Sequence, residues 1–308
     1  MQFQTTHQKT DLATKRSWQR IDGVLLLDKP SGMTSNSALQ LARRLFSAAK
    51  AGHTGTLDPL ATGLLPLCFG EATKFSSDLL EADKTYEAEV LFGVTTDTGD
   101  AEGQVRVRLP VNFDRADLEA VLLRFRGPIR QVPPMYSALK RDGKPLYELA
   151  RQGIEVERAP RDVIIHELEL LELAGDRCRL RVTCSKGTYI RTLAEDIGAA
   201  LACGAHLTAL RRTAVGALRI DDAMTLDRLN SLSELERSAC LQPPDALLKK
   251  LPAVYLDEQA AERFFHGNPV TAEVLQGSCR VYDKNRLLGL GEADAEGQLR
   301  PRRLVVYG

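Results

Sequence analysis

The loop around Asp58 combines a residue type and a setting that suit chemistry. The stretch AGHTGTLDPLATGLLP, at residues 51–66, is rich in glycine and turn-forming residues. Asp58 is the only Asp, Glu, Lys or Arg between Lys50 and Glu71, and an apolar run follows it. A carboxylate has a reference pKa of about 3.9, so Asp58 is expected to be ionised at neutral pH unless burial raises its pKa. Catalytic groups are often held on loops by a rigid scaffold, and this pattern predicts a loop that holds one acid in a pocket.

A structural role is the alternative interpretation of Asp58. Asp-Pro often opens a turn in which the carboxylate bonds its own backbone. Glycoside hydrolysis is a second alternative, but it usually needs two carboxylates that flank the scissile bond. No other acid in the chain has a comparable setting, so the sequence disfavours that chemistry.

Other catalytic motifs are incomplete or missing from the sequence. No G-x-x-x-x-G-K-[ST], H-E-x-x-H or G-x-S-x-G motif occurs, which disfavours an ATPase, a metalloprotease and a serine hydrolase. Residues 97–103 resemble a calcium loop, but the spacing is wrong, and they predict a hairpin turn instead. Cys203 and His206 are only two of the four ligands that a structural zinc site needs, so no metal is expected.

The bulk composition fits a soluble globular protein. The chain has 308 residues, enough for one large domain or two ordinary ones, with 44% hydrophobic and 27% charged residues. Its 41 basic and 41 acidic residues cancel, which neither supports nor excludes a nucleic-acid partner. The six cysteines form no C-x-x-C pair and are expected to be reduced and mostly buried. No apolar run reaches 18 residues and no signal-peptide pattern opens the chain, so we expect a cytoplasmic protein with no membrane partner.

Strand and helix patterns surround the Asp58 loop. Residues 22–29 predict a short buried strand, followed by a turn and a helix with Ser35 as its N-cap. Residues 71–81 predict a helix. Residues 85–92 alternate in the manner of a half-buried strand, which turns Tyr86 inward together with alternate apolar residues.

A second strand-to-helix unit lies further along the chain. Residues 177–184 alternate between inward cysteine, leucine or valine and outward arginine or threonine. An apolar stripe then predicts a helix that begins near Ile190 and ends at Gly204. Tyr189 and Arg191 therefore lie where a strand passes into a helix, a position that suits ligand binding.

The two ends of the chain have different patterns. Residues 1–20 are polar and aperiodic and predict a loose tail. Prolines at residues 242–252 indicate a hinge. Beyond it, short strand-like runs at 279–282, 287–290 and 304–307 predict a small β-rich module.

Several motifs, in order, resemble one family. They are GVLLLDKPSGMTS, GHTGTLDPLATGLLP, KTYEAEVLFG, MYSALKRDGKPLYELARQGIEV, SKGTYIRTLAEDIG and ALRRTAVG. Together they resemble the TruB-type tRNA pseudouridine synthases from about Asp22 to the C-terminus. The resemblance implies an α+β fold, in which a catalytic domain with a mixed, largely antiparallel sheet (residues 21–250) precedes a small β-rich, PUA-like RNA-binding domain (residues 251–308).

The implied activity is isomerisation of the T-loop uridine of tRNA, at position 55, to pseudouridine. The enzyme would flip the base out, break the N1–C1′ bond and rejoin uracil to the ribose through C5. The resemblance implies no cofactor and no metal, the T arm of tRNA as partner, and a monomer. A non-catalytic RNA-binding or RNA-folding protein, with a structural Asp58, is the alternative.

The resemblance also implies roles for single residues. Asp58 matches the nucleophile, which could attack the ribose or the uracil or take part in elimination, and Arg191 matches the arginine that pairs with it. The substrate-binding positions that match are His53, Tyr86, Tyr189, Leu210 and Lys29. On pattern alone, Tyr86 would be a core tyrosine and Arg191 an exposed helix residue. Candidates for phosphate contacts are Lys140, Lys144, Arg151, Lys186, Arg211 and Arg212.

Overall fold

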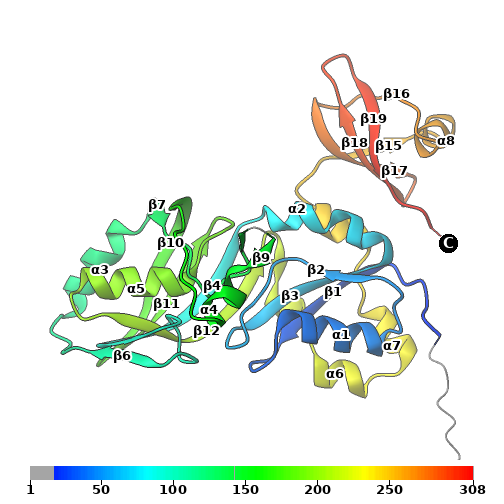
Figure 1. Cartoon of the computed structure of the whole chain (residues 1–308). Helices are drawn as coiled ribbons and strands as arrows, with labels where there is room; N and C mark the ends of the chain where they lie inside the picture. The colour runs from blue at the N-terminus through cyan, green and yellow to red at the C-terminus, as the bar shows by residue number, and fades with distance from the viewer. Residues whose placement is uncertain (1–16, 142, 308) are drawn as a thin grey trace, which may run out of the picture.

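One large mixed sheet forms the body of the molecule (Figure 1). The computed structural model describes residues 17–141 and 143–307. The main path of the sheet runs through β14 (Met224–Thr225), β1 (Gly23–Lys29), β3 (Thr62–Phe69), β12 (Ala205–Val215), β4 (Lys84–Phe92), β11 (Arg177–Cys184), β10 (Arg161–Ala174) and β7 (Gly127–Gln131). Off this path, β2 (Ala51–His53) pairs with β3 and β13 (Leu218–Arg219) with β12. The pairs β1–β14 and β3–β12 are parallel and the others antiparallel, which confirms the predicted sheet type.

The alternating strands are confirmed. In β4, Ala88, Val90 and Phe92 are buried, and in the neighbouring β11 the inward residues are Cys178, Leu180, Val182 and Cys184. Helix α5 (Ile190–Ala200) covers this face with the stripe that the sequence predicted, although it ends at Ala200 rather than at Gly204. These residues share one hydrophobic core with α3 (Arg115–Arg124).

Two further hydrophobic clusters lie at the other end of the sheet, one on each face of β1 and β3, which are buried on both sides. Leu25 and Leu27 point towards α1 (Ser35–Leu45), while Val24 and Leu26 point towards η1 (Gly70–Phe75) and α2 (Ser76–Leu80). In place of the single helix predicted over 71–81, the chain forms the 3-10 turn η1 followed by the short helix α2. The remaining helices of this part are α4 (Leu146–Arg151), η2 (Ile220–Asp222), α6 (Leu226–Ser231), α7 (Glu234–Ala239) and η3 (Pro244–Leu248).

The cap of α1 differs from the expected one. Thr34 is the N-cap, and its hydroxyl accepts a hydrogen bond of 3.0 Å from the amide of Ser37. Ser35 is the first helical residue and is buried. Its hydroxyl donates to the carbonyl of Leu57 and accepts from the amide of Leu57, at 3.0 and 2.8 Å. The side chain therefore ties α1 to the Asp58 loop.

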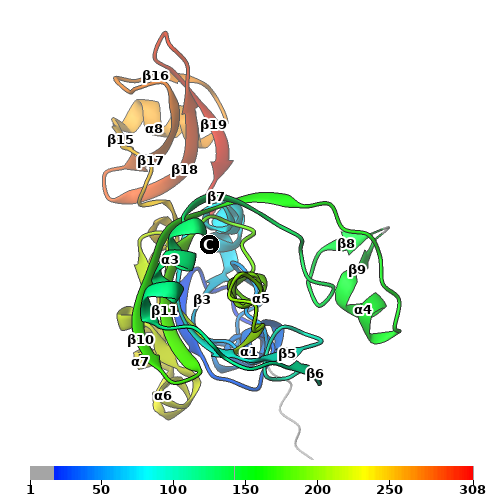
Figure 2. The ribbon, with the colours of Figure 1, turned by 90° about the vertical axis from the view of Figure 1, so that its left-hand side faces the viewer.

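Two small hairpins and a separate domain complete the fold. The hairpins are β5 (Val94–Thr96) with β6 (Val105–Arg108), and β8 (Lys140–Arg141) with β9 (Lys144–Pro145). The C-terminal sheet follows the order β15 (Ala253–Leu256), β17 (Gly277–Asp283), β18 (Arg286–Ala293), β19 (Gln298–Leu304) and β16 (Val270–Thr271), with α8 (Glu258–Phe265) against it. Figure 2 shows this domain standing apart from the large sheet. The β-rich module is confirmed, but the strand expected at 304–307 is wrong, because β19 ends at Leu304.

The predicted hinge is a packed element. In η3, the side chains of Ala246, Leu247 and Leu248 are buried, because the prolines begin a 3-10 turn whose apolar side chains face the core. That core also includes Tyr282 of the C-terminal domain.

The predicted loose tail includes residues 17–20, whose side chains are exposed but which contact α1 and the segment after it. Gln19 pairs with the segment after α1, where its amide bonds the carbonyl of Ser47 at 2.7 Å. The guanidinium of Arg43 lies over the ring of Trp18. Residues 1–16 lie outside the described residues.

Five of the six cysteines are buried, as expected, and none forms a disulfide; Cys240 is partly exposed. Across residues 17–141 and 143–307, no helix is both long and apolar enough to cross a membrane.

Candidate active site

The Asp58 loop joins β2 to β3 and is fixed from several sides. Ser35 holds Leu57 from α1, and the guanidinium of Arg212 donates to the carbonyls of Gly55 and Leu64 at 3.2 and 2.7 Å. At Gly63 the chain has φ +101°, and a Cβ there would lie 2.3 Å from the carbonyl oxygen of Arg212. Only glycine allows β3 to approach β12 this closely. The loop is therefore anchored by residues far away in the sequence.

Asp58 and Arg191 form an ion pair. The distance from Nη2 of Arg191 to Oδ2 of Asp58 is 3.0 Å. The side chain of Asp58 is 42% exposed, whereas that of Arg191 is 7% exposed. Arg191 lies in the first turn of α5, as expected, but it is a buried residue and not a surface arginine. The structure thus brings together the two residues that the resemblance paired.

Arg191 is surrounded by acceptors. Besides Asp58, it faces Asp100 at 3.3 Å and donates to the carbonyls of Thr98 and Tyr136 at 3.0 and 2.6 Å. A guanidinium has five donors in a fixed plane, and these four acceptors hold that plane in one orientation. The pair is therefore rigid on the arginine side and open on the aspartate side.

Asp100 is a site residue that sequence reasoning missed. It lies in the turn between β5 and β6, which the sequence correctly predicted as a hairpin turn. Its buried carboxylate accepts from the hydroxyl of Thr98 at 2.6 Å and the amide of Glu102 at 3.1 Å. Gly99 lets the turn lie against α5, since a Cβ there would be 2.9 Å from Cδ of Glu195. No local pattern reveals that contact, which joins segments about 90 residues apart.

Opposing effects act on the pKa of the Asp58 carboxyl group. Burial raises the pKa of this carboxyl above its ordinary value, while the charge of Arg191 lowers it and that of Asp100 raises it further. The carboxylate is partly exposed although protein surrounds most of it. A carboxylate with reduced solvation is a better base and nucleophile than one in water.

Tyr86 and Tyr189 lie near enough to Asp58 for its charge to act on their pKa values. Tyr86 is half-buried on β4 and packs between the cluster around α5 and the cluster around α1, as does Leu210 on β12. Tyr189 is the N-cap residue of α5, where Gln131 bonds its amide and its carbonyl at 3.0 and 3.2 Å. Burial raises the pKa of both tyrosines, and the charge of Asp58 adds to the rise. Both hydroxyls are therefore protonated at neutral pH.

His53 and Lys29 occupy different depths. His53 is half-buried on β2, and burial followed by the charge of Arg212 lowers its pKa, so the ring is neutral at pH 7. Lys29 is fully buried, and its ammonium donates to the carbonyls of Pro30 and Met33, both at 2.8 Å. Burial lowers its pKa to about 8, although the charge of Asp58 opposes the shift. The ammonium also lies 3.4 Å from the carbonyl of Pro59, so Lys29 contacts the Asp58 loop.

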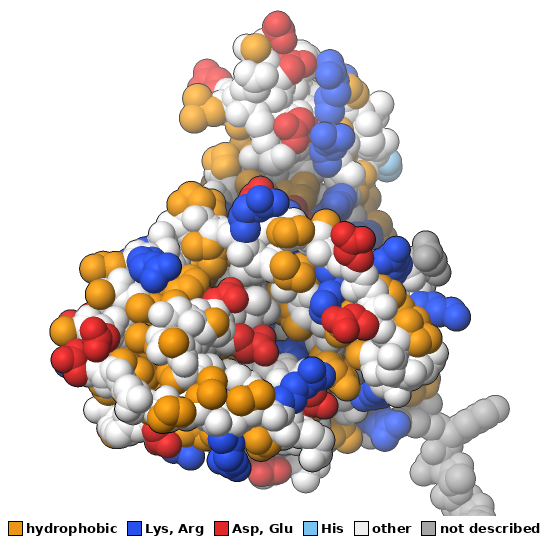
Figure 3. Space-filling view, turned by 60° about the vertical axis from the view of Figure 1, so that its left-hand side comes forward, with side chains coloured by type: hydrophobic (Ala, Val, Ile, Leu, Met, Phe, Trp, Pro, Cys, Tyr) orange, Lys and Arg blue, Asp and Glu red, His pale blue; other side chains and the backbone are white. Residues whose placement is uncertain are grey.

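The six candidates for phosphate contacts separate into three groups. Arg212 is wrong, because it is buried and its guanidinium is used within the Asp58 loop. Arg211 and Lys186 are paired with Asp28 and Glu81, respectively. Lys140, Lys144 and Arg151 are exposed. Figure 3 shows acidic side chains within a hollow on the face that it draws, with Lys and Arg side chains around the hollow.

Within residues 17–141 and 143–307, no group of three or more His, Cys, Asp or Glu side chains could hold a metal ion.

Comparison with known proteins identifies the family. The model described as TruB family pseudouridylate synthase (N terminal domain) matches residues 43–190. The tRNA pseudouridylate synthase B C-terminal domain matches residues 191–249, and the C-terminal domain of pseudouridine synthase II TruB matches residues 252–305.

Curated relatives cover nearly the whole chain. A protein of Dechloromonas aromatica (strain RCB), named tRNA pseudouridine synthase B, is 63% identical over 94% of this chain and 98% of its own length. A protein of Burkholderia lata with the same name is 62% identical over 93% of this chain and 91% of its own length.

Solved structures agree on the fold. One from an H/ACA RNP bound to a substrate RNA containing 2'-deoxyuridine has a TM-score of 0.70 at 25% identity, and it covers 92% of this chain and 85% of that chain. One from a Cbf5-Nop10-Gar1 complex has a TM-score of 0.70 at 27% identity, with coverage of 93% and 84%. Fold and comparisons together define a pseudouridine synthase, an enzyme of the isomerase class. The chain belongs to the TruB family.

Proposed function

We propose that this protein isomerises the T-loop uridine of tRNA, at position 55, to pseudouridine, with Asp58 as the nucleophile. The relatives that are 63% and 62% identical are named tRNA pseudouridine synthase B, which supports tRNA as the substrate. The observation that carries the proposal is the ion pair of 3.0 Å in which a buried arginine holds a carboxylate that remains accessible to solvent.

The reaction needs a group that acts on the nucleoside and is then released. The N1–C1′ bond breaks, the uracil turns, and C5 joins C1′ while the hydrogen on C5 leaves as a proton and N1 gains one. An ionised Asp58 can act by adding to the ribose, by adding to the uracil, or by removing a proton from the ribose. Arg191 favours the ionised carboxylate against the effect of burial, and it is already in position before the substrate enters.

The surroundings of Asp58 suit a base that has been flipped out of an RNA loop. Flipping costs a few kcal/mol, and stacking on an aromatic ring contributes about 1–3 kcal/mol per base. Tyr86 offers that ring, Tyr189 and Leu210 line the pocket, and His53 fills space beside the loop with a neutral side chain. Lys29 acts by contacting the loop.

Contacts outside the pocket would bind the T arm. Lys140, Lys144 and Arg151 are exposed and near one another in β8, β9 and α4, so they are our candidates for phosphate contacts. We assign catalysis to residues 21–250 and further RNA binding to the PUA-like domain at residues 251–308, in a monomer. A tRNA substrate would place the protein in the cytoplasm.

The test uses tRNA transcript that carries tritium at C5 of uridine, without added metal or nucleotide. Joining C5 to the ribose expels that tritium, so the wild type should release one equivalent per tRNA. Asp58→Asn should release none, and its affinity for tRNA should stay within a few-fold. A transcript with cytidine at position 55 is the control for the site. If neither protein releases tritium while both bind tRNA, the chain is a non-catalytic RNA-binding protein.

A further inference from the structure

The two domains share a hydrophobic interface. Tyr282, Leu287, Leu290 and Val305 of the C-terminal domain lie in one cluster with side chains of the catalytic domain, which include Phe75, Leu79, Leu247 and Leu248. The hydroxyl of Tyr282 also donates to Asp245 at 2.6 Å. An interface of this kind resists sliding apart, but apolar contacts alone do not fix an angle, because they are not directional.

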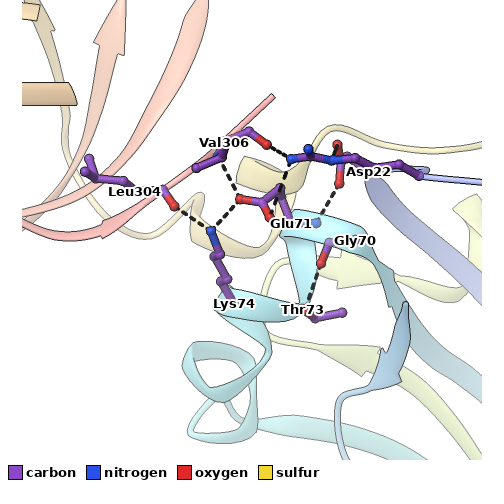
Figure 4. Close-up of polar contacts among 8 residues, drawn as sticks. Asp22, Gly70, Glu71, Thr73, Lys74, Leu304 and Val306 are labelled. Carbon is purple, nitrogen blue, oxygen red and sulfur yellow. Dashed lines mark hydrogen bonds and ion pairs between the residues drawn. The ribbon is translucent and has the colours of Figure 1, made fainter. Parts of the chain in front are cut away.

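Directional contacts are supplied by Glu71 in η1 (Figure 4). Its Oε2 atom accepts from the ammonium of Lys74 at 2.6 Å and from the amide of Val306 at 2.8 Å. The same ammonium donates to the carbonyl of Leu304 at 2.8 Å. The side chain of Glu71 is only 13% exposed, so water competes weakly for these bonds.

The N-terminal segment joins the same group. The carboxylate of Asp22 accepts from the amide of Glu71 at 2.6 Å. Arg20 donates to the carbonyl of Val306 and lies 3.9 Å from Glu71. A Cβ at Gly70 would lie 2.0 Å from Oδ1 of Asp22, so glycine is needed for this approach. We call Arg20, Asp22, Glu71 and Lys74, with the main chain of Gly70, Leu304 and Val306, the Glu71 clasp.

A second polar contact lies beside the clasp. The guanidinium of Arg303 contacts Asp78 at 2.9 Å, the hydroxyl of Ser77 at 3.1 Å and the carbonyl of Lys74 at 2.8 Å. The strand that ends in these contacts, β19, also carries Arg300 and Arg302, with side chains 62% and 68% exposed. Each lies within 4 Å of a carboxylate of its own domain. The clasp therefore fixes the direction in which two exposed cations point.

We propose that Glu71 determines specificity for whole tRNA over its isolated T arm, by holding the C-terminal domain at one angle to the catalytic domain. The proposal rests on the proposed function, in which both domains contact one tRNA. An RNA that spans both domains gains from a fixed angle, because no binding energy is lost in ordering the domains. A T-arm hairpin that contacts only the catalytic domain gains nothing from it.

The experiment compares kcat/KM for whole tRNA and for a T-arm hairpin, measured by tritium release from C5. The proteins are the wild type, Glu71→Ala, Arg303→Ala and the control Glu119→Ala, which removes an exposed ion pair on α3. Glu71→Ala should lower kcat/KM for whole tRNA about fivefold if the competent orientation falls to a fifth of the population. The value for the hairpin should stay within twofold. Arg303→Ala should act in the same direction, and Glu119→Ala should change neither substrate.

Small-angle scattering of each free protein tests the angle itself. Glu71→Ala should give a broader distribution of interatomic distances than the wild type. An equal fall on both RNAs, or no fall on either, would overturn the proposal, and so would an unchanged scattering curve. Should the wild type release no tritium from either RNA, the proposed function fails, while scattering still decides whether the clasp fixes the domains. Arg303→Ala keeps the test informative if Glu71→Ala does not fold.

Discussion

At the scale of single residues, Asp58 and Arg191 have different relations to solvent. The aspartate is partly exposed, whereas the arginine is buried among Asp58, Asp100 and two carbonyls. Three charges of alternating sign therefore follow one another from the exposed Asp58 to the buried Asp100. Asp100 touches nothing that could react, so we regard it as a residue that positions Arg191.

Asp100→Asn should lower kcat about 100-fold if Asp58 is the nucleophile, as we propose, because a small displacement of Arg191 moves the Asp58 carboxylate away from its productive position. The tRNA affinity should change little, since Asp100 is buried. Single-turnover tritium release and filter binding measure the two quantities. Glu102→Gln, an exposed change in the same turn, is the matched control and should remain active. Equal losses in the two variants would contradict the positioning role.

The raised pKa of Asp58 also predicts a dependence on pH. In the proposed mechanism the ionised form of Asp58 reacts, so kcat should fall on the acid side at a higher pH than an ordinary carboxyl group would give. Because the folded pKa lies above the unfolded one, ionisation of Asp58 opposes folding as pH rises through the folded pKa. Asp58→Asn should therefore have a higher Tm than the wild type at pH 7, and the difference should vanish near about pH 4. Calorimetry across this range checks it, and a lower Tm at pH 7 would contradict the sign.

At the scale of elements, local sequence patterns predicted the position of a residue on its strand or helix, whereas contacts between distant segments could not be predicted from the sequence. Alternation placed Tyr86 on the inner face of β4, and the apolar stripe placed Arg191 at the start of α5, because both depend on residues a few positions apart. Asp100 was missed, and Arg212 was predicted to contact phosphate, because the contacts that define their roles join segments distant in sequence. At Ser35 the local pattern was wrong by one residue, since Thr34 is the N-cap. The hydrogen bonds of Ser35 with Leu57 could not be predicted from the sequence.

The approach of β3 to β12 at Gly63 gives a prediction at this scale. Gly63→Ala should lower the free energy of unfolding by about 3 kcal/mol or more, since it adds both a clash with Arg212 and an unfavourable positive φ. Gly52→Ala is the control in β2, where a Cβ would meet nothing within 4 Å, and it should change stability by less than about 0.5 kcal/mol. Urea denaturation measures both. Similar values for the two variants would show that β3 can move away from β12.

At the scale of the whole molecule, the two domains share one hydrophobic cluster. Each domain would therefore expose apolar side chains if the other were removed. Leu247 and Leu248 of η3 lie between the two sheets, in the segment where the sequence predicted a hinge. Prolines indicated that the chain turns there, but only the packing of both domains shows that the turn is buried.

The wild type should consequently unfold in one transition. Tyr282→Ala removes a buried ring from the interface and should cost about 3–5 kcal/mol, and we expect it to separate unfolding into two transitions. Tyr255 is 66% exposed and its ring stacks on that of Tyr282. Tyr255→Ala should therefore leave a single transition. Differential scanning calorimetry distinguishes these outcomes, and two transitions in the wild type would contradict the coupling.

The arrangement of the cysteines has a practical consequence. Burial raises the pKa of Cys68, Cys178, Cys184, Cys203 and Cys279, so their thiols are both covered and protonated at neutral pH. Cys240 is the partly exposed one of the six. Because the thiolate is the reactive form, a maleimide dye should attach to Cys240 in the folded protein and to the others only on unfolding. The natural sequence therefore provides one position for a fluorescent reporter of tRNA binding, with no cysteine to remove.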